Sequence, residues 1–301
     1  MILAPAGDGL RLVTQPEHAA LAGSLAEAWG ADGFAAPDPL PAVRLAVHAH
    51  DDGWQPVDRH PTLTDDGTPR NFHEQPADRW TRLYRRGIDE VARADRYAGL
   101  LVSLHGSGLR RRRYGLSPSW GDTPPAFAAF VRAEERRQQS LAAAMRDDPG
   151  DDRVTAGDLR LLDSLHERGR SADGEATPSR LWHNYRFLQA LDALSLRICG
   201  SSFESAEGDS RAEPFSVQRV PTTLDGEDVT LRVSPAADSH GDDEADAVFR
   251  VDPYPFAEDA VWTTLRARRL ASTTFADDRA LREAYHGVET ESLTVVLVPE
   301  P

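Results

Sequence analysis

Residues 48–54, HAHDDGW, place two histidines and two aspartates within five positions, followed by Gly53 and Trp54. Imidazole nitrogens and carboxylate oxygens are common ligands of divalent metals such as Mn, Fe, Mg and Zn. The same residues would also suit an acidic helix end with two ordinary histidines, closed by Gly53 at the helix C-terminus. The chemistry therefore depends on which of these side chains face the protein interior and on what meets them there.

Helical periodicity separates the two histidines. In residues 41–54, PAVRLAVHAHDDGW, His50 and Asp51 follow Val47 by three and four positions, so they continue the apolar stripe of a helix. His48 aligns instead with charged residues on the opposite face. We therefore predict that His50 and Asp51 point inward, where two neighbours can share one ion near the helix end, and that His48 points outward.

Three further helical segments each place one potential metal ligand in an apolar stripe. The ligands are His18 in residues 14–30, His105 in residues 95–109 and Asp192 in residues 179–199. A buried carboxylate such as Asp192 is costly without a cationic partner. Each residue alone has an ordinary explanation, either a hydrogen-bonded core histidine or an aspartate paired with an arginine. Together they predict one interior site for one or two divalent metal ions, with five ligands: His18, His50, Asp51, His105 and Asp192.

The order of these residues resembles the HD-domain superfamily of metal-dependent phosphohydrolases, all-helical proteins with a His…His-Asp…Asp pattern. The matching positions are His18, His50, Asp51 and Asp192. More closely, the chain resembles the uncharacterised HD-like family DUF3891. The segments that carry this resemblance are QPEHAALAGSLAEAWG (15–30), HDDGW with Asp58 (50–58), GTPRNF (67–72), YAGLLVSLHG (97–106), NYRFLQALDALSL (184–196) and DPYPF (252–256).

The resemblance implies a metal-dependent hydrolase that acts on a phosphoester such as a nucleotide. A bound metal ion would lower the pKa of its water, with Asp51 and Asp58 as the catalytic carboxylates. Two features depart from the superfamily pattern, because the chain has no lysine after His50-Asp51 and carries the additional His105. A second ion at His105 leaves open a di-metal oxygenase acting on a small polar substrate. A non-catalytic metal- or ligand-binding protein is the third alternative.

An anionic small-molecule substrate would also need cationic and polar contacts. Arginine suits bidentate phosphate binding, and residues 109–115, LRRRRYG, supply the run Arg110 to Arg113 shortly after His105, with Arg110 and Arg112 as the named candidates. The alternative is a solvated basic loop on an acidic surface. Asn184, two turns before Asp192, is a further candidate for substrate binding.

The surrounding sequence predicts an α+β protein, with an all-helical HD-like core followed by a small, mostly antiparallel β region. We expect the metal-binding core in residues 1–200 and the β region, packed on it, in residues 215–301, with a homodimer left open. Local expectations are a hairpin, a connection, an acidic loop and a helix, at residues 1–14, 199–214, 239–247 and 277–287 respectively.

Composition narrows the function classes. The chain has 301 residues, a formal net charge of −15, no lysine and one cysteine, Cys199. A single cysteine excludes an internal disulfide and a cysteine metal cluster, and the acidic charge argues against general nucleic-acid binding. No apolar run approaches the ~20 residues that span a bilayer, and no signal peptide is recognisable, so we expect a cytoplasmic protein. The acidic, lysine-free composition suits either a high-salt cytoplasm or a GC-rich genome.

Overall fold

The computed structural model describes residues 1–119, 121, 123–171, 179–203, 212–236 and 245–301. Much of the predicted connection at 199–214 and of the predicted acidic loop at 239–247 lies outside the described residues.

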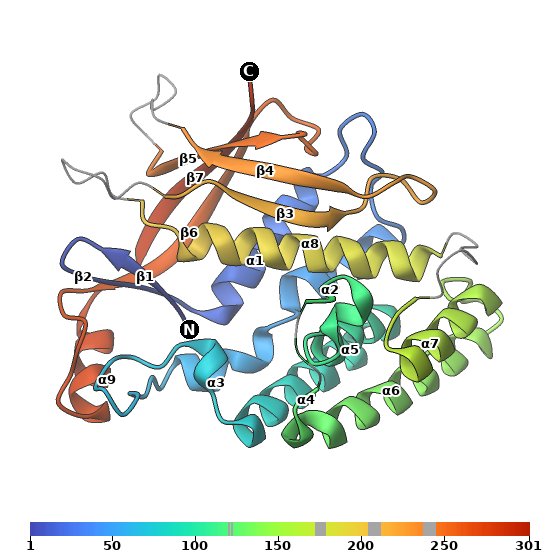
Figure 1. The fold of residues 1–301 in the computed structure, drawn as a ribbon, viewed down its shortest axis with the longest axis horizontal. Helices are drawn as coiled ribbons and strands as arrows, with labels where there is room; N and C mark the ends of the chain where they lie inside the picture. Colours follow the sequence, from blue (N-terminus) through green and yellow to red (C-terminus); the bar gives the residue numbers. More distant parts are fainter. Residues whose placement is uncertain (120, 122, 172–178, 204–211, 237–244) are drawn as a thin grey trace.

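Helices make up most of the chain between residues 15 and 200 (Figure 1). The α-helices are α1 (Gln15–Ala28), α2 (Leu40–Ala49), α3 (Gln55–Asp58), α4 (Ala77–Ala94), α5 (Arg96–Gly108), α6 (Pro125–Arg146), α7 (Ala156–Arg168), α8 (Arg180–Gly200) and α9 (Asp278–Gly287). Short 3-10 turns are η1 (Asp52–Trp54), η2 (Phe72–Glu74) and η3 (Arg112–Gly115). The four helical segments expected to carry metal ligands are confirmed as α1, α2, α5 and α8, and the expected C-terminal helix as α9.

Side-chain caps define where three of these helices begin. The side chains of Thr14, Asp95 and Ser179 accept hydrogen bonds from the first-turn amides of α1, α5 and α8. A capping side chain satisfies an amide that has no partner within the helix, which fixes the first residue of the helix. The starting points of three of the helices that carry cluster residues are therefore set locally.

The strands form one seven-stranded sheet in the order β1-β2-β6-β7-β5-β4-β3. They are β1 (Ile2–Ala6), β2 (Gly9–Val13), β3 (Phe215–Val220), β4 (Val229–Pro235), β5 (Ala247–Asp252), β6 (Val261–Leu270) and β7 (Glu291–Pro299). All neighbours pair antiparallel except β5 and β7, which are parallel. The predicted N-terminal hairpin is confirmed, with Ile2 opposite Val13.

The predicted fold class, an all-helical core followed by a small and mostly antiparallel β region, is wrong. The N-terminal hairpin belongs to the same sheet as the C-terminal strands, because Leu10 of β2 pairs with Leu270 of β6. β7 inserts between β5 and β6, and this insertion makes the sheet mixed. Pairing between such distant segments depends on the tertiary fold and leaves no local periodicity to read.

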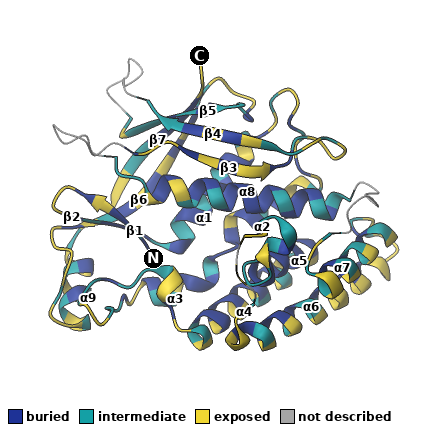
Figure 2. Ribbon diagram, viewed as in Figure 1, coloured by how far each residue is buried: buried dark blue, intermediate teal, exposed yellow. Residues whose placement is uncertain are grey.

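Two helices, α1 and α8, separate the sheet from α4, α5, α6 and α7, whereas α9 contacts β6 directly. α1 packs against β6, and α8 packs against β3 and β1. On their other sides, α1 contacts α2 and both α2 and α8 contact α5, while α4, α6 and α7 form the outer helical layer (Figure 1). Figure 2 shows α8 largely buried, whereas α4, α6 and α7 each present an exposed face. The middle layer of α1, α2, α5 and α8 therefore lies where polar side chains are shielded from water.

Among the described residues, no helix combines the length and apolar character needed to cross a bilayer.

Candidate metal centre

Five potential metal ligands meet in the middle helical layer. Two overlapping groups have ligand atoms within 4.8 Å of one another, and both groups contain His50: His18, His50 and Asp192 in one, His50, Asp51 and His105 in the other. Their exposed fractions lie between 0% and 3%. The structure thus brings together all five residues that the sequence proposed as ligands.

The end of α2 allows two neighbouring residues to reach the same space. α2 ends at Ala49, His50 is its cap, and Asp51 leaves the helical conformation with φ −116° and ψ 15°. His48, two residues before His50, is exposed. The predicted facing of His48, His50 and Asp51 is therefore confirmed.

A glycine is required at position 53, but not as the end of a helix, which is what the sequence suggested. It lies inside η1 and is not among the glycines with positive φ. A Cβ on Gly53 would lie 2.2 Å from the carbonyl oxygen of Leu83 and 3.0 Å from the amide nitrogen of Gly87, both on α4. Close approach of η1 to α4, rather than a left-handed helix end, requires this glycine.

Hydrogen bonds orient His18 within the cluster. Its Nδ1 lies 3.1 Å from Ser195 Oγ, and the Ser195 hydroxyl donates to the backbone carbonyl of Asp192 at 3.1 Å. Ser195 therefore accepts from His18 Nδ1–H, which leaves a lone pair on Nε2 in the neutral ring. That nitrogen lies 3.1 Å from Asp51 Oδ2. Two acceptors face each other at this distance only if a cation or a proton lies between them.

His50 shows the same arrangement. Its Nδ1–H donates to the carbonyl of Val47 at 2.7 Å, so the lone pair of Nε2 points into the cluster. Nε2 lies 3.5 Å from Asp192 Oδ1 and 3.8 Å from Asp51 Oδ2, and within the described part of the chain it has no hydrogen-bond partner. Asp51 Oδ1 likewise has none. These buried, unsatisfied atoms fit the donor set of a divalent cation.

His105 meets the cluster from α5. Its Nδ1 lies 2.8 Å from the side-chain amide of Gln189, while Nε2 and the Gln189 Oε1 have no partner. The two orientations of an amide differ only by exchange of nitrogen and oxygen. The orientation that places Oε1 against Nδ1–H satisfies both groups and leaves His105 Nε2 as a bare ligand atom.

The charged groups of the cluster shift one another's pKa values. Burial opposes protonation of His50, but Asp51 and Asp192 outweigh burial and raise the pKa of His50 to about 9. Burial lowers the pKa of His105 to about 3. The carboxyl group of Asp192 has a lowered pKa because its contacts with His50, His105 and Arg113 outweigh the effect of burial. A proton on His50 thus balances the negative charge of Asp51 and Asp192. A metal cation in the same position would balance that charge instead.

Tyr84, on α4, also faces the cluster and was not identified from the sequence. Burial and the nearby carboxylates of Asp51 and Asp192 raise the pKa of Tyr84 well above its usual value. The phenol therefore keeps its proton over the physiological range. Its position in the apolar stripe of α4, four residues after Trp80, gave no sign of a polar role.

Arg113 belongs to the run of arginines 110–113 that the sequence offered for phosphate binding, and it reaches the cluster from η3. Its Nη2 donates to Asp192 Oδ2 at 2.9 Å and its Nη1 to the carbonyl of Gln189 at 3.3 Å. Arg112, Arg113 and Tyr114 all have positive φ, between 47° and 53°. Left-handed backbone costs about 1–2 kcal/mol for each non-glycine residue. No periodic pattern predicts a side chain presented from such a turn.

The remaining predicted site residues lie away from the cluster or have other contacts. Asp58 accepts hydrogen bonds from the Met1 ammonium at 2.8 Å and from the Gln15 amide at 2.6 Å. Arg110 stacks on the rings of Trp80 and Phe127, 4.1 and 3.8 Å from their centroids.

Arg112 is exposed on the η3 turn. Asn184 donates to the Asp38 carbonyl at 2.7 Å and to the Tyr97 hydroxyl at 2.8 Å. The contacts of Asn184 therefore join the start of α8 to α5 and to the segment before α2.

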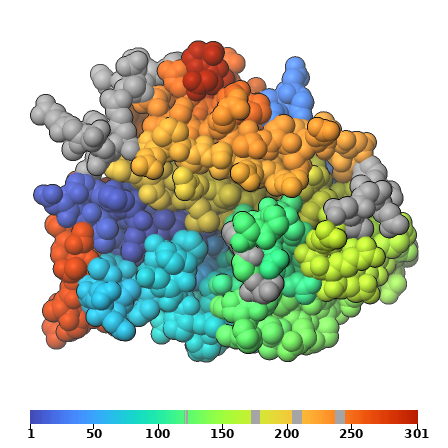
Figure 3. Space-filling model, viewed as in Figure 1, coloured from blue at the N-terminus to red at the C-terminus, as the bar shows by residue number. Residues whose placement is uncertain are grey.

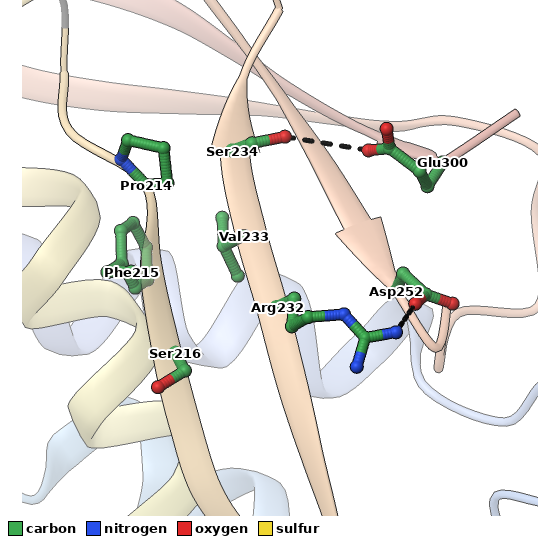
Figure 4. A pocket seen from close by; sticks show the side chains of 8 residues that line it. All are labelled: Pro214, Phe215, Ser216, Arg232, Val233, Ser234, Asp252 and Glu300. Carbon is green, nitrogen blue, oxygen red and sulfur yellow. Dashed lines mark hydrogen bonds and ion pairs between the residues drawn. The ribbon is translucent and has the colours of Figure 1, made fainter.

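A surface pocket at the β3 and β4 edge of the sheet is separate from the cluster (Figure 4). The described residues that line it include no histidine and one cation, Arg232, which is paired with Asp252. Ser234 and Glu300 lie opposite one another across its upper end, 3.5 Å apart. The pocket thus lacks the combination of histidines and carboxylates that the buried cluster offers.

The fold and the cluster define a layered protein in which two overlapping histidine and aspartate groups lie between helices that cover one mixed sheet. The chain belongs to DUF3891, a family described as a protein of unknown function, whose model matches residues 1–272. No curated protein and no solved structure matches the chain. The family thus gives no reaction, and a function has to be argued from the cluster.

Proposed function

We propose that the protein is a metal-dependent hydrolase of HD-like type that acts on a phosphoester such as a nucleotide. His18, His50, Asp51 and Asp192 would hold one divalent ion, and Asp51 and His105 would supply ligands to a second. One observation carries the proposal. The lone pairs of His18 and His50 face carboxylate oxygens at 3.1 to 3.8 Å in a space closed to solvent.

The donor set suits Mn, Fe, Mg or Zn, since it combines imidazoles with carboxylates and has no thiolate. A bound ion lowers the pKa of its water and polarises a phosphoryl oxygen. Ser195 accepts a hydrogen bond from Nδ1 of His18 and Val47 accepts one from Nδ1 of His50, which orients both rings. Tyr84 keeps its proton beside Asp51, so it can donate a hydrogen bond to an oxygen atom bound in the cluster.

The second group favours an alternative, a di-metal oxygenase acting on a small polar substrate. His50, Asp51 and His105 lie within the same 4.8 Å limit as the first group. Asp51 therefore stands where one carboxylate can serve two ions. The two reactions differ in metal and co-substrate, because the oxygenase needs iron and molecular oxygen.

The test is elemental analysis of the protein purified without chelators, followed by assays on a phosphoester panel. We expect bound divalent metal, loss of metal in His50→Ala and Asp192→Ala, and retention of metal in His48→Ala, the matched control on the exposed face. Phosphoester turnover with Mn would support the hydrolase, whereas oxygen-dependent turnover of an iron-loaded protein would support the oxygenase. A metal-free protein that gains no stability on adding metal would contradict both, leaving a non-catalytic role.

A further inference from the structure

We propose that Arg113 binds the phosphoryl group of the substrate at the solvent side of the metal cluster. This inference rests on the phosphoester hydrolysis proposed above. The Arg113 guanidinium lies along the face of α8 that carries Asp192, with Nη2 on the carboxylate at 2.9 Å and Nη1 on the Gln189 carbonyl at 3.3 Å. It is thus positioned by two separate contacts on one helix.

Arg113 lies between the cluster and the solvent. Its side chain is 13% exposed, whereas the Asp192 side chain beneath it is 3% exposed. The segment that follows α5, green in Figure 3, lies at the surface of the face shown there. An anion that approaches from this side meets the guanidinium before it meets the cluster.

A second polar group near Arg113 has no partner. The hydroxyl of Tyr185 is buried and has no hydrogen-bond partner among the described residues, although a buried hydroxyl normally has one. Tyr185 lies seven residues before Asp192, on the face of α8 that also presents Gln189. Its ring packs 5.9 Å from that of Tyr114, the residue after Arg113. An oxygen of a bound phosphate would satisfy this hydroxyl.

The backbone around Arg113 is held in a rare conformation. Arg112, Arg113 and Tyr114 are left-handed, and the buried Tyr114 anchors the turn through its hydroxyl, 2.7 Å from Ser107 Oγ. Such strain persists only where the surrounding structure enforces it, and it is concentrated at functional sites. A fixed turn places the guanidinium before any ligand arrives, which lowers the entropic cost of binding.

Arg113 can exchange its present partner, the Asp192 carboxylate, for a phosphoryl group. Guanidinium binds phosphate with two parallel hydrogen bonds. A metal ion in the cluster would share the charge of Asp192, so this carboxylate would compete less strongly for Arg113. A phosphoryl oxygen then takes the place of Asp192 Oδ2 on the arginine, while Asp192 remains with the cluster.

The experiment measures binding of inorganic phosphate to the Mn-loaded full-length protein by titration calorimetry, with metal content determined in parallel. Arg113→Gln should weaken phosphate binding at least about tenfold, because a hydrogen bond to a charged group is lost, while Mn stoichiometry is unchanged. Arg113→Lys should give an intermediate loss, because it keeps the charge but not the planar fork. Arg93→Gln, an exposed arginine in the last turn of α4, is the matched control and should bind as the wild type.

Equal phosphate affinity in the wild type and Arg113→Gln would overturn the proposal. So would an equal loss in Arg112→Gln, or loss of Mn together with phosphate in both Arg113 variants, which would mean that Arg113 only holds Asp192 in place. Mn binding without phosphate binding in the wild type would overturn this inference alone. Absence of Mn binding would overturn the proposed function as well.

Discussion

The hydrogen bond made by Nδ1 of each histidine determines whether its Nε2 offers a lone pair to the cluster. Val47 fixes His50 through a backbone carbonyl, whereas His18 depends on a single side chain, that of Ser195. A backbone partner survives any substitution at its position, but a side-chain partner does not. The ring orientation of His18 can therefore be tested by mutation, as can that of His105, whose Nδ1 meets the side chain of Gln189.

We expect Ser195→Ala to weaken Mn binding by about 10- to 100-fold, the usual effect of removing the partner that orients a ligating histidine. The His18 ring would lose the acceptor of its Nδ1–H, 3.1 Å away. Calorimetric titration of the metal-free protein with Mn measures the change. Ser140→Ala is the control, since Ser140 also donates to a carbonyl of its own helix but is exposed. Unchanged affinity in Ser195→Ala would show that Ser195 does not orient His18.

The sequence predicted the cluster residues because each lies in, or just beyond, a regular amphipathic helix. For such residues the spacing alone determines which side faces the core. Arg113 could not be found in this way, since it is presented by a left-handed turn whose direction no repeat encodes. Tyr84 was missed for the opposite reason, because its ring does occupy a core position and only its hydroxyl is polar.

At the scale of elements, the position of Asp51 depends on how closely η1 approaches α4. Gly53 and Gly87 meet backbone to backbone, so neither position leaves room for a side chain. This crossing holds the turn that follows α2, and it brings Tyr84 toward Asp51.

Gly53→Ala should destabilise the protein by about 1–3 kcal/mol, the usual cost of overpacking, because the new Cβ meets the Leu83 carbonyl at 2.2 Å. Urea denaturation measures the free energy of unfolding. Gly200→Ala provides the control at the end of α8, where a Cβ meets nothing within 4 Å. An equal stability of the two variants would contradict the close crossing.

His166 joins α7 to α6 and gives the protein a predicted sensitivity to acid. Gln138 donates through Nε2 to Ser103 and Ser107, so its Oε1 accepts from His166 Nε2–H at 2.7 Å. Burial, together with the nearby Arg111, lowers the pKa of His166 to about 4. In the unfolded chain the pKa of a histidine is near 6.5, so as the pH falls the unfolded state takes up this proton at a higher pH than the folded state does. The unfolded state thus binds more protons as the pH falls from about 6.5 to 4, and stability is lost in that window.

The melting temperature of the wild type should therefore fall between pH 6.5 and pH 4.5, and His166→Gln should show a smaller fall. Differential scanning calorimetry at several pH values measures both slopes. His73→Gln removes an exposed imidazole and controls for the loss of a surface histidine. If His166→Gln and the wild type have the same pH slope, the side chain of His166 does not cause the loss.

For the whole molecule, the central helices and most of the sheet share one hydrophobic core, and a smaller second cluster joins α9 to β2 and β6. Residues from β1, from the helices and from β7 belong to the same buried cluster, with Ile2, Leu101 and Leu297 as examples. The sequence predicted the hairpin, several strands and the helices, since each has a local pattern. It did not predict that β2 pairs with β6, because a register between distant strands is decided by packing.

A fragment of residues 1–200 tests this shared core. It retains every proposed metal ligand, but it lacks β6, which covers α1 and pairs with β2, and β3, which covers α8. We expect the fragment to lack a cooperative thermal transition by circular dichroism and to bind Mn more weakly than the full chain. A cooperative transition with full Mn affinity would show that the helical part folds on its own.

The pairing of Leu10 with Leu270 has a consequence for synthesis on the ribosome. At ~5–20 residues per second, β2 emerges on the order of tens of seconds before β6, its partner in the sheet. All five residues of the cluster are translated in that interval. The nascent chain thus exposes an unpaired strand edge, a recognised start for aggregation, for as long as the helices that contain the metal ligands are being made.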